Sequence, residues 1–384
     1  MSITQLSYVE YEGDPRMWCL EPLDFGPLNL VVGRNATGKS RLSNVITGLM
    51  SILSGKKPGA LSSGTYDAHF RLKEIEFRYQ LAFNKNIVTH ESLSVNGENR
   101  MSRAEDGVGK IFYEKENRFL DFSVDPTAIA INARRDKLQH PYIFELSEWA
   151  EASATYRFGT DFGKETLLAM VGDASAGGAE DKFSKTDDPN DPISTYTRGF
   201  KRFGADFDQA ILEDMRSLGY EIDEVAAENI DPSIARATNG VPLITMVVVE
   251  KGISTRIPQI YLSQGMFRVL ALVIKLNWAV FNRQQGLIII DDLGEGLDYE
   301  RSCAAVKLTL GKAKSGGFQV IATTNDRFVM NSVPLDNWIV LHRRGSTVRG
   351  YTARNSREKF DNFKYTGLSN FDFFASGAFE ENDE

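Results

Sequence analysis

The sequence predicts an α/β fold with a mixed sheet, an antiparallel β subdomain and a helical insertion lobe. Two short apolar runs between turn signals, residues 287–290 and 318–324, are typical of buried parallel strands, and the segment between them is long enough for a helix. Residues 3–32 and 70–122 instead alternate between apolar and polar side chains, which predicts antiparallel strands. The two patterns in one chain indicate a parallel core joined to an antiparallel extension.

The individual elements follow from the same patterns. Residues 3–32 are expected to form two or three strands separated by turns rich in glycine and proline, and residues 70–122 a meander with a hairpin turn at Asn96 and Gly97. A further strand is expected over residues 241–249. Helices are expected over residues 42–49, 143–152, 206–218, 264–281 and 300–314.

The composition is that of a soluble globular chain. Its 384 residues are 42% hydrophobic, and 44 basic against 52 acidic residues leave a net charge of −8, so any contact with nucleic acid has to be a local patch. Cys19 and Cys303 lie far apart and the histidines do not cluster, which argues against disulfides and a structural zinc site. No signal peptide is recognisable, and no apolar run reaches the ~18 residues that span a bilayer. We therefore expect a cytoplasmic protein without membrane contact.

A phosphate-binding loop of the form G-x-x-x-x-G-K-[ST] occupies residues 33–40, directly after the apolar run at residues 28–32. In such a loop successive backbone N–H groups point into one concavity around the phosphates, and the following helix directs its positive end at them. Lys39 is expected to reach the β- and γ-phosphates of ATP, and Ser40 to ligate Mg²⁺. The residues predicted to bind the nucleotide in this segment are Gly33, Arg34, Asn35, Ala36, Thr37, Gly38, Lys39, Ser40 and Arg41.

Two carboxylates follow the apolar run at residues 287–290, at the edge of the predicted parallel sheet where ligands bind in open α/β folds. Four apolar residues followed by Asp291 and Asp292 are typical of a Walker B motif. Asp291 is predicted to hold Mg²⁺, and Asp292 to orient or deprotonate the attacking water. Glu295 is an alternative base, although its position suits a solvated turn residue better.

A third motif, formed by Ser263, Gln264 and Gly265, stands at the start of the helix expected over residues 264–281. A serine at that place is also a common helix cap. In this order and spacing, however, the Leu-Ser-Gln-Gly segment resembles the signature loop of ABC-class ATPases. Residues 296–298 similarly resemble the D-loop of that class.

Nearly the whole chain resembles the RecF/SMC/OLD-like branch of ABC ATPases, which includes ATPase chains found beside nucleases in bacterial defence systems. The resemblance implies an ABC-type ATPase head in three parts. Residues 1–140 carry the Walker A motif and the β meander, residues 141–240 form the helical insertion lobe, and residues 241–384 carry the remaining motifs with a C-terminal tail. Unlike SMC proteins, the insertion has no sustained heptad pattern for a coiled coil.

The resemblance also implies an activity, the hydrolysis of ATP to ADP and phosphate, in which two heads sandwich two ATP molecules. The signature loop of one head then contacts the γ-phosphate held by the other. Catalysis is assigned to Lys39, Asp292 and Asn325, the last at the place of the family's switch histidine. Because Asp292 replaces the usual glutamate and Asn325 cannot titrate, we expect slow hydrolysis.

The expected assembly is a homodimer or higher homo-oligomer that gates a separately encoded effector, such as a nuclease or toxin in anti-phage defence. A RecF-like DNA-repair ATPase and an ATP-dependent scaffold with little turnover are the alternatives. Gln80 and Gln139 are both candidates for a Q-loop glutamine. DNA contact is possible through three basic pairs, although such pairs are more often ordinary surface: Arg134-Arg135, Lys201-Arg202 and Arg343-Arg344.

Two further features concern mobility and the C-terminus. Residues 172–179 and 186–192 are rich in glycine, proline and other helix breakers, which predicts mobile loops. After the switch strand, aromatic residues from Phe360 to Phe379 predict a C-terminal cap packed on the head, or alternatively a docking segment for a partner. The acidic end of the chain is expected to be solvated.

Overall fold

The computed structural model describes residues 1–56, 62–159, 164, 168–169, 191–229 and 243–380. The chain divides into two compact units. Unit 1 comprises Met1–Ala154, Gln285–Ile289 and Phe318–Glu384, and unit 2 comprises Thr155–Gln284 and Ile290–Gly317. The three-part division expected from the sequence remains a prediction.

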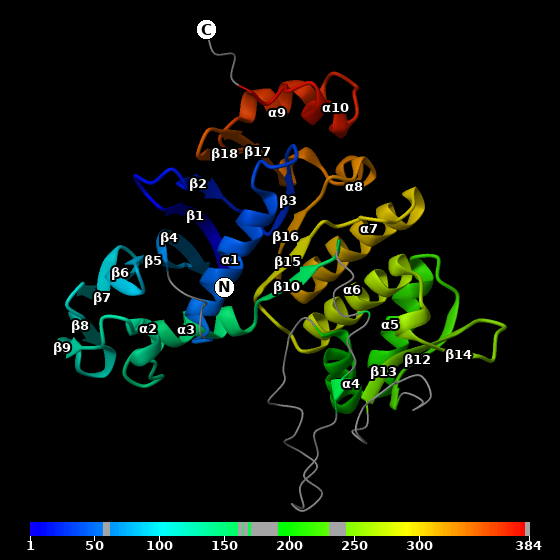
Figure 1. Ribbon diagram of the computed structural model, residues 1–384, viewed down its shortest axis with the longest axis horizontal. Helices are drawn as coiled ribbons and strands as arrows, with labels where there is room; N and C mark the ends of the chain where they lie inside the picture. The colour runs from blue at the N-terminus through cyan, green and yellow to red at the C-terminus, as the bar shows by residue number, and fades with distance from the viewer. Residues whose placement is uncertain (57–61, 160–163, 165–167, 170–190, 230–242, 381–384) are drawn as a thin grey trace, which may run out of the picture. The chain divides into compact units, whose positions relative to one another are not determined.

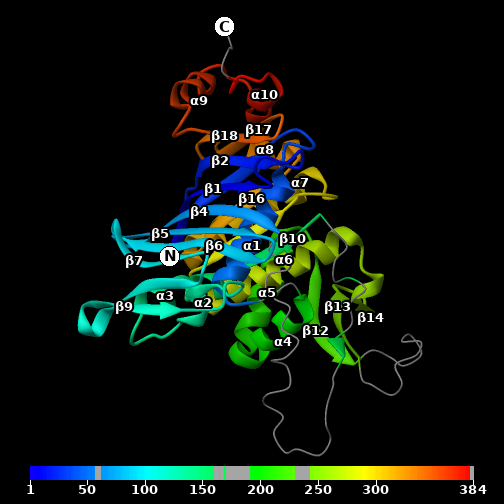
Figure 2. The same ribbon diagram turned by 60° about the vertical axis from the view of Figure 1, so that its left-hand side comes forward.

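A large mixed sheet forms the frame of unit 1 (Figures 1 and 2). The strands of this sheet that lie wholly or mostly in unit 1 are β1 (Ser2–Glu10), β2 (Trp18–Asp24), β3 (Leu28–Val32), β4 (Ser63–Leu72), β5 (Ile75–Asn84), β6 (Ile87–Val95), β7 (Glu98–Ala104), β8 (Val108–Tyr113), β9 (Arg118–Ser123), β15 (Leu287–Asp291), β16 (Gln319–Thr323), β17 (Trp338–Arg344) and β18 (Thr347–Thr352). β3 pairs in parallel with β16 and β17, whereas the run from β2 through β1 and β4 to β9 is antiparallel. The predicted combination of a parallel core with an antiparallel extension is therefore confirmed.

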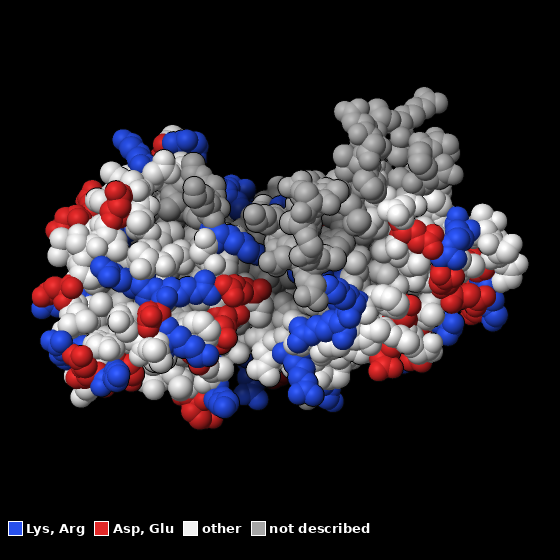
Figure 3. Space-filling view, turned by 90° about the horizontal axis from the view of Figure 1, so that it is seen from below, with Lys and Arg blue, Asp and Glu red and all other residues white. Residues whose placement is uncertain are grey.

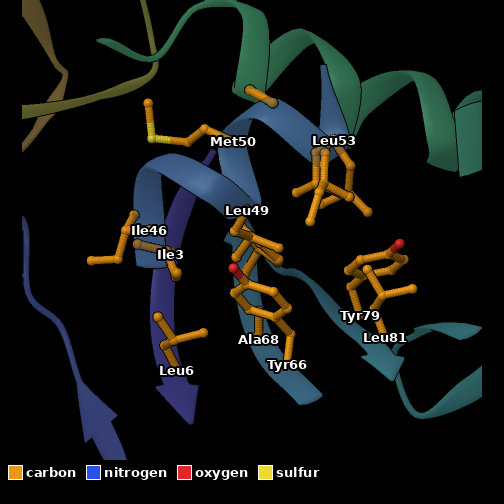
Figure 4. Packing of buried hydrophobic residues seen from close by; sticks show 14 of the residues in the cluster. Ile3, Leu6, Ile46, Leu49, Met50, Leu53, Tyr66, Ala68, Tyr79 and Leu81 are labelled. Carbon is orange, nitrogen blue, oxygen red and sulfur yellow. The ribbon is translucent and has the colours of Figure 1, made fainter. Parts of the chain in front are cut away.

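The core of unit 1 is centred on α1 (Lys39–Leu53), the helix that follows the phosphate loop. Its buried residues Ile46, Leu49 and Leu53 recur every three or four positions and so share one face. Figure 4 shows them over side chains of β1, β4 and β5, namely Ile3, Leu6, Tyr66, Ala68, Tyr79 and Leu81. Each fully buried aliphatic side chain contributes about 1.5–3 kcal/mol to folding, so this face fixes the direction of α1 beneath the loop.

The antiparallel meander contains the predicted hairpin turn, and a buried carboxylate ties it to the helix that follows. Asn96 and Gly97 have φ angles of 50° and 79°, the left-handed pair that a tight hairpin turn requires. Glu91 on β6 accepts hydrogen bonds from Arg103 Nε at 3.2 Å and from the main-chain N–H of Ala130 at 2.7 Å. The sheet is thereby tied to α2 (Ala130–Ala133), which precedes α3 (Pro141–Glu151) in the chain.

The C-terminal segment forms a cap on unit 1, beyond β17 and β18 (Figures 1 and 2). The cap consists of α9 (Arg357–Lys364) and α10 (Asn370–Ala375), and it also contacts α8 (Arg327–Ser332). Phe360 and Phe373 are fully buried, with ring centroids 4.6 Å apart. The cap interpretation is thus confirmed, although Tyr365 remains 89% exposed. The acidic residues 381–384 lie outside the described part of the chain.

Unit 2 combines helices with a small antiparallel sheet. Its elements are β10 (Ala154–Arg157), β11 (Leu168–Ala169), α4 (Pro192–Phe203), α5 (Ala205–Ser217), β12 (Ile222–Asn229), β13 (Leu243–Glu250), β14 (Arg256–Pro258), α6 (Gln264–Phe281) and α7 (Tyr299–Gly316). The predicted insertion is therefore not purely helical, because β12 lies within it and pairs with β13. Local sequence did not indicate this strand, since only Ile222 and Val225 of β12 are buried and its other residues are acidic, small or polar.

Two sequence expectations concern the rest of unit 2. α6 is long and apolar enough to meet the criteria for a membrane span, with a mean hydropathy of 1.3, but 67% of that window is buried inside the protein. It is therefore a core helix. The breaker-rich segments at 172–179 and 186–190 lie outside the described residues, which resume just before α4.

Candidate functional site

The phosphate loop joins β3 to α1 through backbone conformations and close contacts that require glycine. The φ angle of Gly38 is 109°, in the region that side chains other than glycine rarely adopt. A Cβ atom at Gly33 would lie 2.6 Å from Thr37 Oγ1 and 3.0 Å from the carbonyl oxygen of Leu341. Both glycines of the motif are thus explained by the fold of unit 1.

Lys39 is held inside this loop. Its Nζ donates to the carbonyl oxygen of Gly33 at 2.7 Å and lies 3.4 Å from that of Arg34, and its side chain is buried. The neighbouring rim residues Arg34, Asn35 and Ala36 are exposed. A buried ammonium group at the N-terminus of a 15-residue helix has the donor chemistry that a polyphosphate requires.

The start of α1 is flanked by an aromatic side chain that sequence reasoning missed. Trp18 backs the loop, because a Cβ at Gly38 would come within 3.3 Å of its ring. Arg41, predicted to bind nucleotide, lies with its guanidinium carbon 4.9 Å from the Trp18 ring centroid and pairs with Glu10. The signal in the sequence was a tryptophan at the start of a strand, which local patterns alone do not connect to the loop.

Asn325 lies at the same edge of the sheet as the phosphate loop. It follows β16, where Thr323 pairs in parallel register with Val31 of β3. The N–H of Thr324 donates to the carbonyl oxygen of Val31 at 3.2 Å, and Asn325 itself is exposed. The structure therefore brings the predicted switch residue and the loop together within unit 1.

The Walker B carboxylates belong to unit 2, where Asp291 ends β15 and Asp292 follows it. The carbonyl oxygen of Asp291 accepts from the N–H of Phe158 at 2.9 Å. Asp292 has a φ angle of 59°, a left-handed conformation that is uncommon for residues with a side chain and is often found at functional sites. Gly159 makes room for it, since a Cβ there would lie 2.7 Å from the Cβ of Asp292. This glycine was not singled out from the sequence.

The signature loop lies against the D-loop within unit 2. Ser263 caps α6, accepting the N–H of Met266 at 3.2 Å, and both Ser263 and Gln264 are exposed. A Cβ at Gly265 would lie 3.5 Å from the carbonyl oxygen of Gly296. The helix-cap interpretation of Ser263 is thus correct, and it leaves the loop facing solvent.

Arg268, which sequence reasoning missed, ties α6 to the residues after Asp292. Its Nη1 donates to the carbonyl oxygen of Glu295 at 3.0 Å and its Nη2 to that of Gly159 at 3.3 Å. The same Glu295 donates its N–H to the carbonyl oxygen of Asp292 at 3.1 Å. The signal available in the sequence was an arginine within a mostly apolar helix, which the fold buries.

Asp298 of the D-loop segment caps α7. Its Oδ1 accepts the N–H of Arg301 at 2.9 Å, and this hydrogen bond holds the pKa of the Asp298 carboxyl below its ordinary value. The carboxylate thereby fixes where α7 begins.

The predicted Mg²⁺ ligands occur one in each unit. Ser40 is exposed in the first turn of α1, and Asp291 is half-buried at the end of β15. Each of them carries an oxygen ligand of the kind that Mg²⁺ takes. These two residues, and the ATP-binding role of the loop, remain predictions.

Several other candidate residues are engaged in contacts within the protein. Gln80 donates to Asp67 at 3.2 Å in the meander, whereas Gln139 is exposed. Arg135 pairs with Glu151, and Arg343 Nε donates to the carbonyl oxygen of Gly345 at 2.8 Å. Basic and acidic side chains are interspersed on the face shown in Figure 3. DNA contact therefore stays a prediction.

Comparison with known proteins identifies the fold. A structure of an SMC head bound to the C-terminal winged-helix domain of ScpA matches with a TM-score of 0.53 at 13% sequence identity, over 91% of this chain and 97% of that one. The chain has the SMC-head fold. The predicted ABC-type ATPase architecture is thereby confirmed as a fold.

Two further solved structures match over similar lengths. The SMC head domain from Thermotoga maritima matches with a TM-score of 0.45 at 12% identity, over 91% of this chain and 98% of that one. An Smc head with an extended coiled coil, bound to the C-terminal domain of ScpA from Pyrococcus furiosus, matches with a TM-score of 0.49 at 10% identity, over 94% and 99%. No protein-family model and no curated protein matches the sequence.

Proposed function

We propose that this chain binds ATP with Mg²⁺ and hydrolyses it slowly as a cytoplasmic ATPase. The observation that carries the proposal is the buried Lys39 inside a glycine-constrained loop at the N-terminus of α1. A cation and a helix N-terminus that converge in this way favour a ligand with several phosphate oxygens. The SMC-head fold supports the same function, because proteins of that ABC-type ATPase fold are expected to bind ATP.

In this proposal each motif residue has one role. Lys39 holds phosphate oxygens, Ser40 and Asp291 hold Mg²⁺, and Asp292 orients or deprotonates the attacking water. When bound, Mg²⁺ neutralises charge on the β- and γ-phosphate oxygens. Asp292 has a shorter side chain than glutamate, and displacement of a catalytic group by about 1 Å costs on the order of 10²-fold in rate. Slow turnover follows.

A second copy of the chain is the proposed partner of the signature surface, which comprises Tyr261, Ser263, Gln264 and Tyr299. Tyr261 and Tyr299 are 65% and 60% exposed beside the signature and D-loop segments. Exposed aromatic side chains are typical anchors of protein interfaces. In the proposed dimer, Ser263, Gln264 and Gly265 reach the nucleotide held by the other copy.

The narrower proposal is that the ATP-driven dimer gates a separately encoded effector, such as a nuclease or toxin in anti-phage defence. An SMC head of the same fold is bound to a domain of ScpA, which supports a separate partner protein for this chain. A RecF-like DNA-repair ATPase and a scaffold with little turnover remain the alternatives. Pull-down from the native host with ATP and Mg²⁺, followed by mass spectrometry, separates them: an effector supports gating, and recombination proteins or DNA support repair.

The first test of the ATP site is calorimetric titration of ATP with Mg²⁺ into purified variants. Lys39→Ala is expected to lose ATP binding by at least about tenfold, because it removes the buried cation. Lys115→Ala, at an exposed lysine, is the matched control. Because Lys39 is buried, Ser40→Ala serves as the second variant, and it should weaken binding only when Mg²⁺ is present. Unchanged affinity in both variants would contradict the site.

A further inference from the structure

One cavity in unit 1 is shared by the phosphate loop and the C-terminal segment. It has a volume of about 390 Å³, and its walls come from the loop rim, the turn between β17 and β18, and the end of the aromatic cap. From the loop it includes Arg34 to Thr37, and from the C-terminal segment it includes Phe374, Phe379 and Glu380. Residues that are far apart in the sequence thus border one space beside the predicted nucleotide site.

Phe379 anchors the C-terminal segment at this cavity. It is 4% exposed, and its ring lies 5.5 Å from that of Tyr351 and 6.1 Å from that of Phe373, between centroids. Gly377, with a φ of 71°, turns the chain so that the N–H of Glu380 reaches its carbonyl oxygen at 2.9 Å. Lys359 of α9 donates to the main-chain oxygen of Glu380. These two hydrogen bonds hold the Glu380 backbone against the turn at Gly377 and against α9.

The hairpin between β17 and β18 connects the two walls of the cavity. Arg343 Nη1 lies 3.4 Å from the carbonyl oxygen of Ala36 in the phosphate loop. The adjacent His342 faces the other wall, with its ring 6.3 Å from that of Phe379 and Nδ1 3.9 Å from Glu380 Oε1. Neighbouring residues of one strand thus contact the loop rim on one side and the C-terminal segment on the other.

Glu380 carries a negative charge, the same sign as the phosphates of the proposed ligand. ATP brings several negative charges to the loop, and Glu380 places a carboxylate in the wall of the cavity that the loop borders. Charges of like sign repel, and salt at physiological concentration screens this repulsion over a Debye length of about 8 Å. Docking of the C-terminal segment and binding of ATP should consequently disfavour each other.

We propose that the docked C-terminal segment, residues 376–380, is an autoinhibitory element that lowers the affinity of the phosphate loop for ATP and is released when ATP binds. The inference rests on the proposed ATP site. Because coupling between two binding equilibria is reciprocal, loosening the segment must raise ATP affinity by the factor by which ATP loosens the segment.

The test compares the affinity for a fluorescent ATP analogue at low and high salt in four variants. Phe379→Ala removes the anchor, Glu380→Gln removes the charge and keeps the packing, and Glu380→Lys reverses the charge. Glu358→Gln, at an exposed carboxylate of α9, is the matched control. We expect affinity to rise about two- to fivefold in Phe379→Ala and Glu380→Gln, and more in Glu380→Lys, with smaller differences at high salt.

Hydrogen exchange of residues 371–380 provides the reciprocal readout. Exchange should quicken when ATP is added to the wild type and stay constant in Lys39→Ala. The proposal is overturned if the Phe379 and Glu380 variants bind ATP as the wild type does, or more weakly, since weaker binding would make the segment part of the ATP site. Failure of the wild type to bind ATP at all would contradict the proposed function instead.

Discussion

At the scale of single residues, Asp292 combines a catalytic assignment with an unusual backbone. Its φ of 59° is one that asparagine adopts readily and alanine does not. Substitution by asparagine therefore removes the carboxylate without added backbone strain, whereas alanine adds about 1–2 kcal/mol of strain. The two variants separate the chemistry of this residue from its conformation.

We predict that Asp292→Asn retains ATP binding and thermal stability while ATP hydrolysis falls about 10²-fold, because the base that acts on water is lost. Asp292→Ala should lose hydrolysis to the same extent and also unfold at lower temperature. Phosphate release and thermal unfolding, measured on both variants, check this. Equal hydrolysis in Asp292→Asn and the wild type would move the role to another carboxylate, with Glu295→Gln as the next variant.

His140 is a histidine whose pKa is lowered by the fold, so it contributes to the pH dependence of stability. Burial lowers the pKa of its ring, whose Nδ1 lies 3.0 Å from the carbonyl oxygen of Phe112. The unfolded chain therefore binds a proton at a higher pH than the folded one does. Stability from this group is present above the unfolded pKa of about 6.5 and is lost as pH falls through the folded value.

We accordingly predict that the free energy of unfolding falls between about pH 7.5 and 5.5, and that His140→Gln reduces this fall. Glutamine keeps a donor for Phe112 and does not titrate. Urea unfolding at both pH values measures the effect, with His90→Gln as the control. An identical pH dependence in His140→Gln and the wild type would exclude His140 as the source.

At the scale of elements, the first two turns of α6 connect the signature loop to the residues around Asp292. Ser263 caps the helix, and Arg268 connects it to Glu295 and Gly159, the residues that surround Asp292. The end of β15 and the start of α6 are thus held as one piece within unit 2. Arg268 is a positioning residue in this arrangement.

We predict that Arg268→Met lowers hydrolysis about tenfold and destabilises the protein by about 1–3 kcal/mol, because two partly buried carbonyl oxygens lose their donor. The KM for ATP should change little, since Lys39 lies in the other unit. Lys307→Met, at an exposed position of α7, is the control for replacing a basic residue by methionine. A large rise in KM with unchanged kcat would contradict a positioning role.

At the scale of the whole molecule, the proposed ATP site predicts that ATP stabilises the folded protein against unfolding. A ligand that binds only the folded state at 100 times its Kd stabilises that state by about 2.7 kcal/mol. ATP should therefore raise the Tm of the wild type in a concentration-dependent way and leave that of Lys39→Ala unchanged. Differential scanning fluorimetry across an ATP series measures both. A Tm that is independent of ATP would contradict the proposed function.

Much of the fold was predictable because it depends on local patterns. The phosphate loop, α6, β15 and β16 have glycine spacing or apolar runs that carry their own signal. The strand β12 was missed, because its pairing with β13 rather than its own residues makes it a strand. Trp18, Gly159 and Arg268 were missed for a similar reason: each acts on residues far away in the sequence.

By itself the sequence determined the nucleotide-type loop and the carboxylates at the end of β15, since each is a property of residues that are neighbours in the chain, and the order and spacing of the motifs indicated the ABC-type architecture. Only the tertiary structure decided that Arg268 and Gly159 meet beside Asp292, and that Phe379 and Glu380 close a cavity against the phosphate loop. These contacts arise when long-range packing buries side chains whose local sequence has no periodicity. That packing, rather than any motif, sets how the loop and the C-terminal segment can influence each other.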